Sequence, residues 1–277
     1  MKLLNFLLTL TLLVFLAFSC DEQQSDEDQF VEDGIENQDA DKELVTTDFN
    51  ELEEKMEEIM YENDESDSEI KKDVVVIKSK GAREVHIDLK IAAGKLKLTG
   101  GASELLTGGF IYSNQEWKPE VKYNIKDKKG FLQIKQPNNE DYNINDDDKY
   151  VWNLKFNDEI PLDFDVNLGA GVSEILLSGM NIRHFNMVMG VGKTEIDLRG
   201  KWKHSADIHL DGGIGLSQIY LPDNVGVMLN VTKGLGGIEV KNLIKKGNSE
   251  YVNKAYENSG IVLKIYLKTG IGKIEVE

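Results

Sequence analysis

The chain is poor in cysteine and proline. Its 277 residues include one cysteine, Cys20, and four prolines. Since there is no second thiol, the chain has no intramolecular disulfide, and beyond Cys20 it has no cysteine-ligated metal and no cysteine nucleophile. These absences remove several classes of enzyme and metal-binding domain.

A long apolar run is also missing. A membrane-spanning helix needs about 20 apolar residues, whereas the apolar stretch of this chain covers residues 3–16. A basic start, that stretch, and small residues directly before Cys20 are typical of a secretory signal. We therefore predict a lipoprotein signal peptide at residues 1–19 and lipidation of Cys20, although Leu16 and Phe18 depart from the commonest lipobox. Cleavage by ordinary signal peptidase, leaving a free thiol, is the alternative.

Basic side chains are scarce in residues 21–70, which contain 22 acidic and two basic residues. Residues 71–277 contain 27 acidic and 29 basic residues, so the net charge of −17 comes from the first segment. Such a segment repels itself and buries too little apolar surface to become ordered. We predict a disordered acidic linker at residues 20–70. A marginal short helix within it would place on one face Leu52, Met56, Ile59 and Met60.

Glycine, by contrast, is plentiful and regularly spaced. A Gly-x-Gly motif recurs five times in the C-terminal half, and a degenerate copy lies earlier, at residues 92–94. The first four full copies follow one another after 21, 23 and 21 residues, and the fifth follows after 36, with an insertion at about residues 244–259. A period near 20 residues indicates a repeat architecture. The last glycines of the six copies are Gly94, Gly171, Gly192, Gly215, Gly236 and Gly272.

The apolar positions change phase at each of these glycines. Before the glycine, the fifth and the first preceding residues are apolar in every copy, and after it the fourth following residue is apolar. Side chains of a strand alternate with a period of two, so a change of parity needs one residue that breaks the pleat, which glycine can do. The pattern predicts an all-β fold over residues 71–277, a β-solenoid or repetitive strand stack with Gly-x-Gly corners. A β-sandwich is the alternative, although the corners lack the Asn-Gly and Asp-Gly pairs of hairpin turns.

An aromatic segment at residues 108–156 follows a different period and is interpreted as an elaboration between the first and second copies. It contains Trp117 and Trp152, and a third tryptophan, Trp202, lies further along the chain. Exposed tryptophans would stack on sugars. Packing of these rings inside the protein is the favoured interpretation.

Residues 83–98, Gly101-Ala102, the predicted strand at residues 117–121 and the later Gly-x-Gly repeats together resemble the bacterial toast-rack domain. Relatives of that domain include the C-terminal domains of cell-wall-active-antibiotic response proteins. The resemblance covers about residues 80–277 and implies a β-solenoid-like fold and an envelope setting, with no established chemistry and no catalytic residues. One departure is Ala92-Ala93-Gly94 in place of Gly-Ala-Gly, which we expect to flatten the first corner.

No motif indicates a cofactor or a metal. The glycines at residues 212–215 precede a strand, whereas phosphate-binding loops precede a helix. The four histidines show no ligand spacing, and His86 and His209 fall at outward positions of alternating strands. The oxygen-rich loop at residues 143–148 lacks the spacing of a calcium loop, so an acidic turn is favoured. We predict no cofactor, no metal site and, without a basic patch, no nucleic-acid partner.

An outward column of the repeat contains carboxylates. If the copies are in register, Glu174 and Glu195 lie about 5 Å apart on adjacent strands, and Lys193 would offset their repulsion. A carboxylate pair at that distance is compatible with glycoside chemistry. A carbohydrate-active enzyme on a solenoid face is therefore the alternative to a non-enzymatic module.

The sequence as a whole predicts a membrane-anchored envelope lipoprotein with a non-enzymatic binding or structural module, in adhesion or envelope stress. Its expected partners are the membrane, through lipidated Cys20, and an envelope protein or glycan. The expected location is the bacterial outer membrane, facing the periplasm or the outside. The acidic residues after Cys20 resemble the surface-export signals of some outer-membrane lipoproteins, and a solvated spacer is the simpler interpretation.

Overall fold

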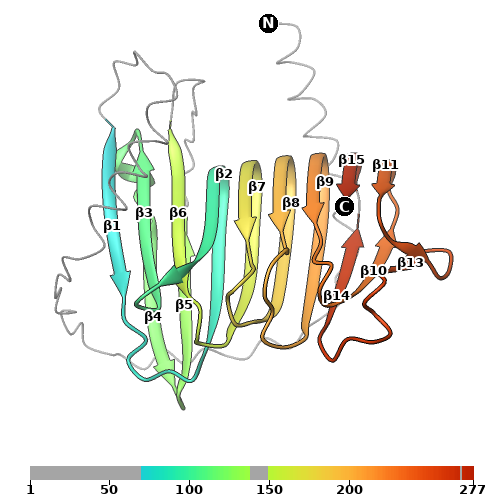
Figure 1. The fold of residues 1–277 in the computed structure, drawn as a ribbon. Coiled ribbons are helices and arrows are strands. Elements are labelled where there is room, and N and C mark those ends of the chain that lie inside the picture. The colour runs from blue at the N-terminus through green and yellow to red at the C-terminus, as the bar shows by residue number, and fades with distance from the viewer. Residues whose placement is uncertain (1–69, 138–148, 269) are drawn as a thin grey trace, which may run out of the picture. The chain divides into compact units, whose positions relative to one another are not determined.

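The computed structural model describes residues 70–137, 149–268 and 270–277, and these residues are built almost entirely of β-strands (Figure 1). They contain 15 strands, one short 3₁₀ turn and no α-helix, so the all-β prediction is confirmed. The predicted signal peptide, and the linker and its helix up to residue 69, lie outside the described residues. In chain order the elements are β1 (Lys71–Ile77), β2 (Glu84–Ala102), β3 (Leu106–Tyr112), η1 (Gln115–Trp117), β4 (Glu120–Lys126), β5 (Lys129–Lys135), β6 (Tyr150–Asn157), β7 (Leu162–Leu176), β8 (Ile182–Asp197), β9 (Ala206–Tyr220), β10 (Gly226–Thr232), β11 (Leu235–Val240), β12 (Ile244–Lys245), β13 (Glu250–Val252), β14 (Val262–Lys268) and β15 (Ile271–Val276).

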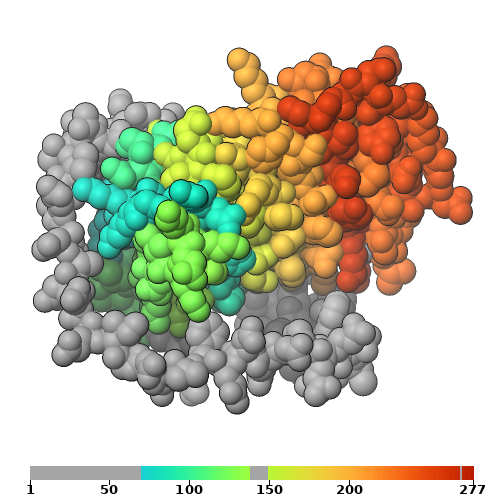
Figure 2. All heavy atoms as spheres, turned by 90° about the horizontal axis from the view of Figure 1, so that it is seen from below, coloured from blue at the N-terminus to red at the C-terminus, as the bar shows by residue number. Residues whose placement is uncertain are grey.

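Four long strands, β2, β7, β8 and β9, carry a Gly-x-Gly or Ala-Ala-Gly corner near their middle and so belong to two layers. Before the corner they form a first layer, ordered β4-β5-β2-β7-β8-β9-β14-β10-β13-β12. After it they form a second layer, ordered β1-β3-β6-β2-β7-β8-β9-β15-β11. The repeats pair in parallel, and Figure 1 shows the arched strands side by side. The predicted stack of strands with glycine corners is confirmed, and Figure 2 shows the N-terminal to C-terminal colours succeeding one another across the molecule.

The corner glycines lie in register on one line across the stack. In five of the six copies φ lies between 140° and 151°, a region that L side chains rarely adopt. Gly236 is the exception. It lies in the last rung, where a rung is one repeat unit of the stack with a strand in each layer. The predicted corner role therefore holds in full for five glycines. In spatial order the line runs Gly94, Gly171, Gly192, Gly215, Gly272 and Gly236.

Lack of space also requires glycine at the corner. A Cβ on Gly192 would lie 1.8 Å from the carbonyl oxygen of Gly171. The first glycine of each motif is constrained in the same way, because a Cβ on Gly213 would lie 2.0 Å from the carbonyl oxygen of Gly190. Adjacent rungs therefore approach backbone to backbone at the corner.

The first corner is not flattened, contrary to the expectation from Ala92. Gly94 has a φ of 151° and pairs with Gly171. β5 ends at Lys135, and the next residue, Gln136, is 5% exposed. Its side-chain Oε1 accepts hydrogen bonds from the N–H groups of Ala92 and Ala93 at 2.8 and 3.2 Å. A side-chain amide takes the place of a preceding backbone rung, and alanine is accommodated there.

Burial follows two of the three predicted apolar columns. The residue five positions before the glycine is 0–5% exposed in all six copies, and the residue four positions after it is buried in every copy but one, Val240. The residue directly before the glycine was predicted to face inward, and this is wrong: the residue is only half-buried in the first four copies, and at the end of the stack Ile271 and Leu235 are 48% and 78% exposed. That residue lies where the parity changes, so its side chain sits on the ridge of the bend.

The last copy does not follow chain order. β14 and β15, which flank the corner of Gly272, lie between β9 and the rung formed by β10 and β11. The insertion predicted at residues 244–259 contains β12 and β13, and β13 pairs antiparallel with β10 before the chain turns back. Asn253 fixes this return: its Oδ1 accepts the N–H of Val227 at 3.0 Å, and its Nδ2 donates to the carbonyl of Val225 at 2.7 Å.

One continuous core lies between the two layers. The elaboration at residues 108–156 supplies β3 to β6, and β2 still pairs directly with β7. Trp117, Trp152 and Trp202 are 4%, 0% and 7% exposed, so the packing interpretation is confirmed for all three rings. Each large apolar side chain buried in this way contributes about 1.5–3 kcal/mol.

We expect Gly213→Ala to destabilise the domain by about 1–3 kcal/mol, because the added methyl group must push the backbone of Gly190 away. Gly247→Ala is the control: a Cβ there meets no atom within 4 Å, and the change should stay within about 0.5 kcal/mol. Neither position has a positive φ. Denaturant unfolding measures both, and equal stability of the two variants would contradict the backbone contact.

Candidate functional site

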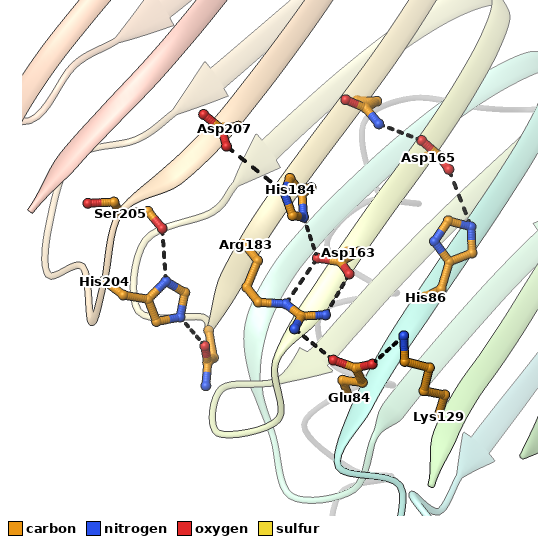
Figure 3. A network of polar contacts seen from close by, with 12 residues as sticks. Glu84, His86, Lys129, Asp163, Asp165, Arg183, His184, His204, Ser205 and Asp207 are labelled. Atoms are coloured by element: carbon orange, nitrogen blue, oxygen red, sulfur yellow. Dashed lines mark hydrogen bonds and ion pairs between the residues drawn. The ribbon is translucent and has the colours of Figure 1, made fainter. Parts of the chain in front are cut away.

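The outer face of the first layer carries a row of alternating histidines and aspartates. In four of the six copies, the residue eight positions before the corner glycine is His86 on β2, Asp163 on β7, His184 on β8 or Asp207 on β9. Each is the direct neighbour of the next across the strands. Because the strands are parallel and in register, one column of the repeat becomes one row on the surface. We call this row, with the side chains that contact it, the histidine–aspartate face (Figure 3).

Arg183 reaches this face through an irregularity in the strand pairing. The register between β7 and β8 shifts by one residue at Arg183, and such a bulge re-aims a side chain. The guanidinium Nη2 and Nε lie 2.7 and 3.3 Å from the carboxylate of Asp163. Its Nη1 lies 2.7 Å from Glu84, which also pairs with Lys129 at 2.8 Å. Arg183 therefore joins β2, β7 and β8 across the face (Figure 3).

Carboxylates hold the histidines in place. Nδ1 of His184 lies 3.0 Å from Asp163, and its Nε2 lies 3.9 Å from Asp207. Nε2 of His86 lies 3.3 Å from Asp165. In the part of the chain that the structure describes, no group of three or more histidine, cysteine, aspartate or glutamate residues is arranged to hold a metal.

These contacts lower the pKa of the carboxyls. Burial raises the pKa of Asp163, but hydrogen bonds from Arg183 and His184 outweigh it, so the pKa lies below its usual value. Hydrogen bonds from Lys129 and then Arg183 lower the pKa of Glu84. Both groups stay ionised to a lower pH than free carboxyls do.

A second row, six positions before the glycine, lies beside the first. His209 and Tyr266 stack there, with ring centroids 4.6 Å apart and planes at 17°. Tyr266 is 38% exposed. On the neighbouring strand, Asn186 donates to Asp165 at 2.8 Å. The two rows form an exposed surface of rings, amides and carboxylates, and the outward positions predicted for His86 and His209 agree with it.

An open depression of about 610 Å³ lies at the end of the first row. Its polar lining includes Arg183, His184 and Asp207 from the histidine–aspartate face, with His204 and Ser205 from the connection before β9. The His204 ring contacts the Asn181 side chain and lies 3.0 Å from the Ser205 carbonyl oxygen. The depression extends the face toward the loops.

The predicted carboxylate pair lies on the other layer. Glu174 and Glu195 are in register on β7 and β8, as expected. The cation beside Glu174 is Lys97, whose Nζ lies 3.0 Å from its Oε1, so the role predicted for Lys193 is wrong. The Glu174 side chain is 47% exposed on an open strand face. Solvent surrounds such a carboxylate, and this geometry gives no support to the enzymatic alternative.

Two predicted sites lie outside the described residues. They are Cys20 and the oxygen-rich loop, of which residues 143–148 are not described. Lipidation and the acidic turn therefore stay predictions. Within the described ranges, no helix has the length and apolarity needed to cross a bilayer.

The sequence analysis missed the histidine–aspartate face. Its signal was present, because counting back eight residues from the glycines of four copies gives His86, Asp163, His184 and Asp207. The outward column with Glu174 and Glu195 follows the corner glycine, whereas this row precedes it. Arg183 carries no such signal, since the register shift that places it on the face is not visible in the spacing.

Two family models match the chain. The N-terminal domain of toast_rack, DUF2154, matches residues 39–220, which is more than half of the sequence. The chain belongs to the toast-rack family. The model of the cell wall-active antibiotics response LiaF C-terminal domain matches residues 177–276 of this toast-rack chain. Both parts of the predicted resemblance are confirmed, and no curated protein matches.

Solved structures extend the comparison. A candidate cell adhesion protein from Clostridium sporogenes ATCC 15579 is 33% identical, with a TM-score of 0.73, and the match covers 75% of the toast-rack chain and 99% of the other chain. A candidate adhesin from Bacteroides fragilis NCTC 9343 is 12% identical, with a TM-score of 0.31, over 76% and 97% of the two chains. A candidate adhesin from Parabacteroides merdae ATCC 43184 is 10% identical, with a TM-score of 0.23, over 76% and 98%.

Arg183→Gln should lower the Tm by a few degrees at neutral pH, because Asp163 and Glu84 lose the donor that they share. A carboxyl with a lowered folded pKa stabilises the fold above its unfolded pKa of about 4, and this contribution is lost as the pH falls through the folded pKa. The Tm difference from wild type should therefore be widest above about pH 5 and close at lower pH.

Thermal unfolding between pH 2.5 and 7, followed by circular dichroism, measures this difference. Lys201→Gln, which removes an exposed cation outside the network, serves as the control for net charge. A Tm difference for Arg183→Gln that does not change with pH would rule out the ion pairs as its cause.

Proposed function

We propose that this toast-rack chain is a membrane-anchored envelope lipoprotein whose β-domain binds an external partner in adhesion. The observation that carries the proposal is the 33% identity to the candidate cell adhesion protein of Clostridium sporogenes over 99% of that chain. Lipidation of Cys20 attaches the domain to the outer membrane. The acidic segment that follows holds the domain away from the bilayer.

The histidine–aspartate face supports a binding role. Arg183 and the carboxylates of Glu84 and Asp163 hold one another in fixed positions before any partner arrives, which reduces the entropy lost on binding. The stacked rings of His209 and Tyr266 add an exposed aromatic surface beside amide and carboxylate groups. Such a surface can bind a glycan or a polar protein surface.

Protease shaving of intact cells tests the location. Wild-type protein should be cleaved from the cell surface, and Cys20→Ala should be lost from the membrane fraction, because both the anchor and export depend on that residue. A periplasmic marker protein that stays intact is the control. Full protection of the wild type from protease would contradict an adhesive role.

Adherence of cells to immobilised glycans and matrix proteins tests the face. His184→Ala combined with Tyr266→Ala should reduce adherence by roughly tenfold or more, because loss of about 1.4 kcal/mol of binding is tenfold in affinity. Glu174→Ala combined with Glu195→Ala alters the outer face of the other layer and is the matched control. If the control loses adherence and the first variant does not, the binding surface lies on the second layer.

The match to the antibiotic-response C-terminal model over residues 177–276 favours a second candidate, an envelope-stress role through a protein partner in the periplasm. The same shaving experiment separates the two, since a periplasmic domain is protected. The relatives related to adhesion and envelope response support a non-enzymatic module in both cases.

A further inference from the structure

The outer side of the second layer is apolar where β1, β3 and β6 lie side by side (Figure 1). Ile111 on β3 and Val151 on β6 alternate with residues of the main core and so point outward. They are nevertheless only 2% and 9% exposed, and they form a cluster of their own. Ile70 and Val74 pack against them. We call these four side chains the outer apolar patch.

The described strands do not explain why this patch is buried. All of them belong to the two layers, so none lies over its outer side. Gly109, which lies beside the patch on β3 and opposite Val74, is also buried although it has no side chain. A glycine inside a strand often marks a place where another backbone approaches closely. The patch therefore has the properties of a docking surface.

Lysines border the patch. On the described strands β1, β3, β6 and the second half of β2, the outward positions include Lys72, Lys155 and Lys95 and contain no acidic residue. Further along the layer, Glu174 on β7 is outward, and it pairs with Lys97. An apolar patch with a basic border fits an amphipathic segment that carries acidic residues beside its apolar stripe.

Such a segment precedes β1 in the chain, at residues 49–61, outside the described part of the structure. On a helix, successive residues are turned by about 100°, and five large apolar residues of the segment then share one stripe. The other positions include five glutamates and one lysine. A helix of this length is marginal in water by itself, so it needs a surface that covers the stripe. The stripe consists of Phe49, Leu52, Met56, Ile59 and Met60.

The path of the chain favours the same segment. Ile70, directly before β1, already lies on the patch. The residues between Tyr61 and Ile70 can span up to about 30 Å when extended, whereas three neighbouring strands are only about 10 Å wide. The match to the N-terminal toast-rack domain begins at residue 39, so residues 49–61 belong to the matched domain.

We propose that residues 49–61 fold as an amphipathic helix on the outer apolar patch, with the apolar stripe facing Ile111 and Val151. The bordering lysines offset the repulsion between glutamates along the helix. The histidine–aspartate face lies on the outer side of the other layer, so the docked helix leaves it free. Residues 21–48 then remain as the tether. The docking does not depend on the proposed adhesive role.

Trypsin cleavage of the purified full chain in detergent tests the docking. Residues 21–70 contain two lysines, Lys42 before the segment and Lys55 within it. Because cleavage follows the population of the open form, the rate at Lys55 relative to Lys42 should be roughly tenfold or more below that of a synthetic peptide of residues 38–62. The peptide supplies the intrinsic ratio of the two rates. The same ratio in the full chain would overturn the proposal.

Two matched double variants compare the two sides of the helix. Leu52→Ser combined with Ile59→Ser removes apolar contacts and should return cleavage at Lys55 to the peptide ratio. Glu51→Ser combined with Glu58→Ser changes the adjacent positions, on the opposite side of the helix, and should leave Lys55 protected. Equal protection or equal exposure in the two variants would contradict docking through the stripe.

Thiol labelling tests the patch itself. Val151→Cys keeps a small apolar side chain there, since a free cysteine behaves as a small hydrophobic residue. The full chain is labelled with a maleimide in detergent, and wild type measures any labelling of Cys20. Adding Leu52→Ser and Ile59→Ser should speed the labelling of the introduced thiol several-fold. An unchanged rate would overturn the proposal.

The connection between β5 and β6 provides the control for this labelling. Residues 138–148 also lie outside the described residues, and they contain two large apolar side chains, Tyr142 and Ile144. Tyr142→Ser combined with Ile144→Ser should leave the labelling rate unchanged. If this variant speeds labelling and the change in the helix does not, the connection covers the patch and the proposal is wrong.

Discussion

Backbone contact at the corner is the constraint on which the rest of the fold depends. Each carbonyl oxygen of Gly171 and Gly192 occupies the space where a Cβ of the next corner would lie. A strand cannot shift along its neighbour without bringing a side chain into that space, so the register of the whole stack is fixed at these points. Fixed register keeps every inward column over the core, since a slip of one residue would turn the apolar side chains to solvent. The apolar columns need only supply volume.

The same constraint determines what the surface can be. Because neighbouring repeats are held in register, one outward position of the repeat becomes a continuous row, and each residue in the row must tolerate the residue on the next strand. The alternation of His86, Asp163 and His184 meets that requirement by placing opposite or hydrogen-bonding groups side by side. Lys97 beside Glu174 meets it on the other layer. Outward residues can be substituted as long as the side chains on adjacent strands still attract or hydrogen-bond one another. The binding surface can therefore change without affecting the corner glycines.

The sequence was sufficient for the corner, the columns and the strand stack, because these features repeat and each repeat confirms the others. It was also sufficient in principle for the histidine–aspartate row, which has the same period. It was not sufficient for features that occur once. The register shift at Arg183, the replacement of a rung by Gln136, and the choice of Lys97 over Lys193 each depend on a single local contact. The spacing also could not predict that the last copy lies between β9 and β10. Gly236 follows Gly215 after 21 residues, the same spacing that separates copies that are adjacent in the stack.

That reordering explains why the last rung is irregular. The inner corners at Gly215 and Gly272 adopt a positive φ and lie against the backbone of the preceding rung. The rung of Gly236 has a described neighbour on one side only, and it does not adopt that φ. Leu235 lies on the ridge, like the residue before every corner glycine, and with a described strand on one side only it is 78% exposed. Because the chain returns between β9 and β10, the regular corner of Gly272 lies inside the stack. The irregular corner of Gly236 lies at the edge, where a repeat lacks a second neighbour to fix its conformation.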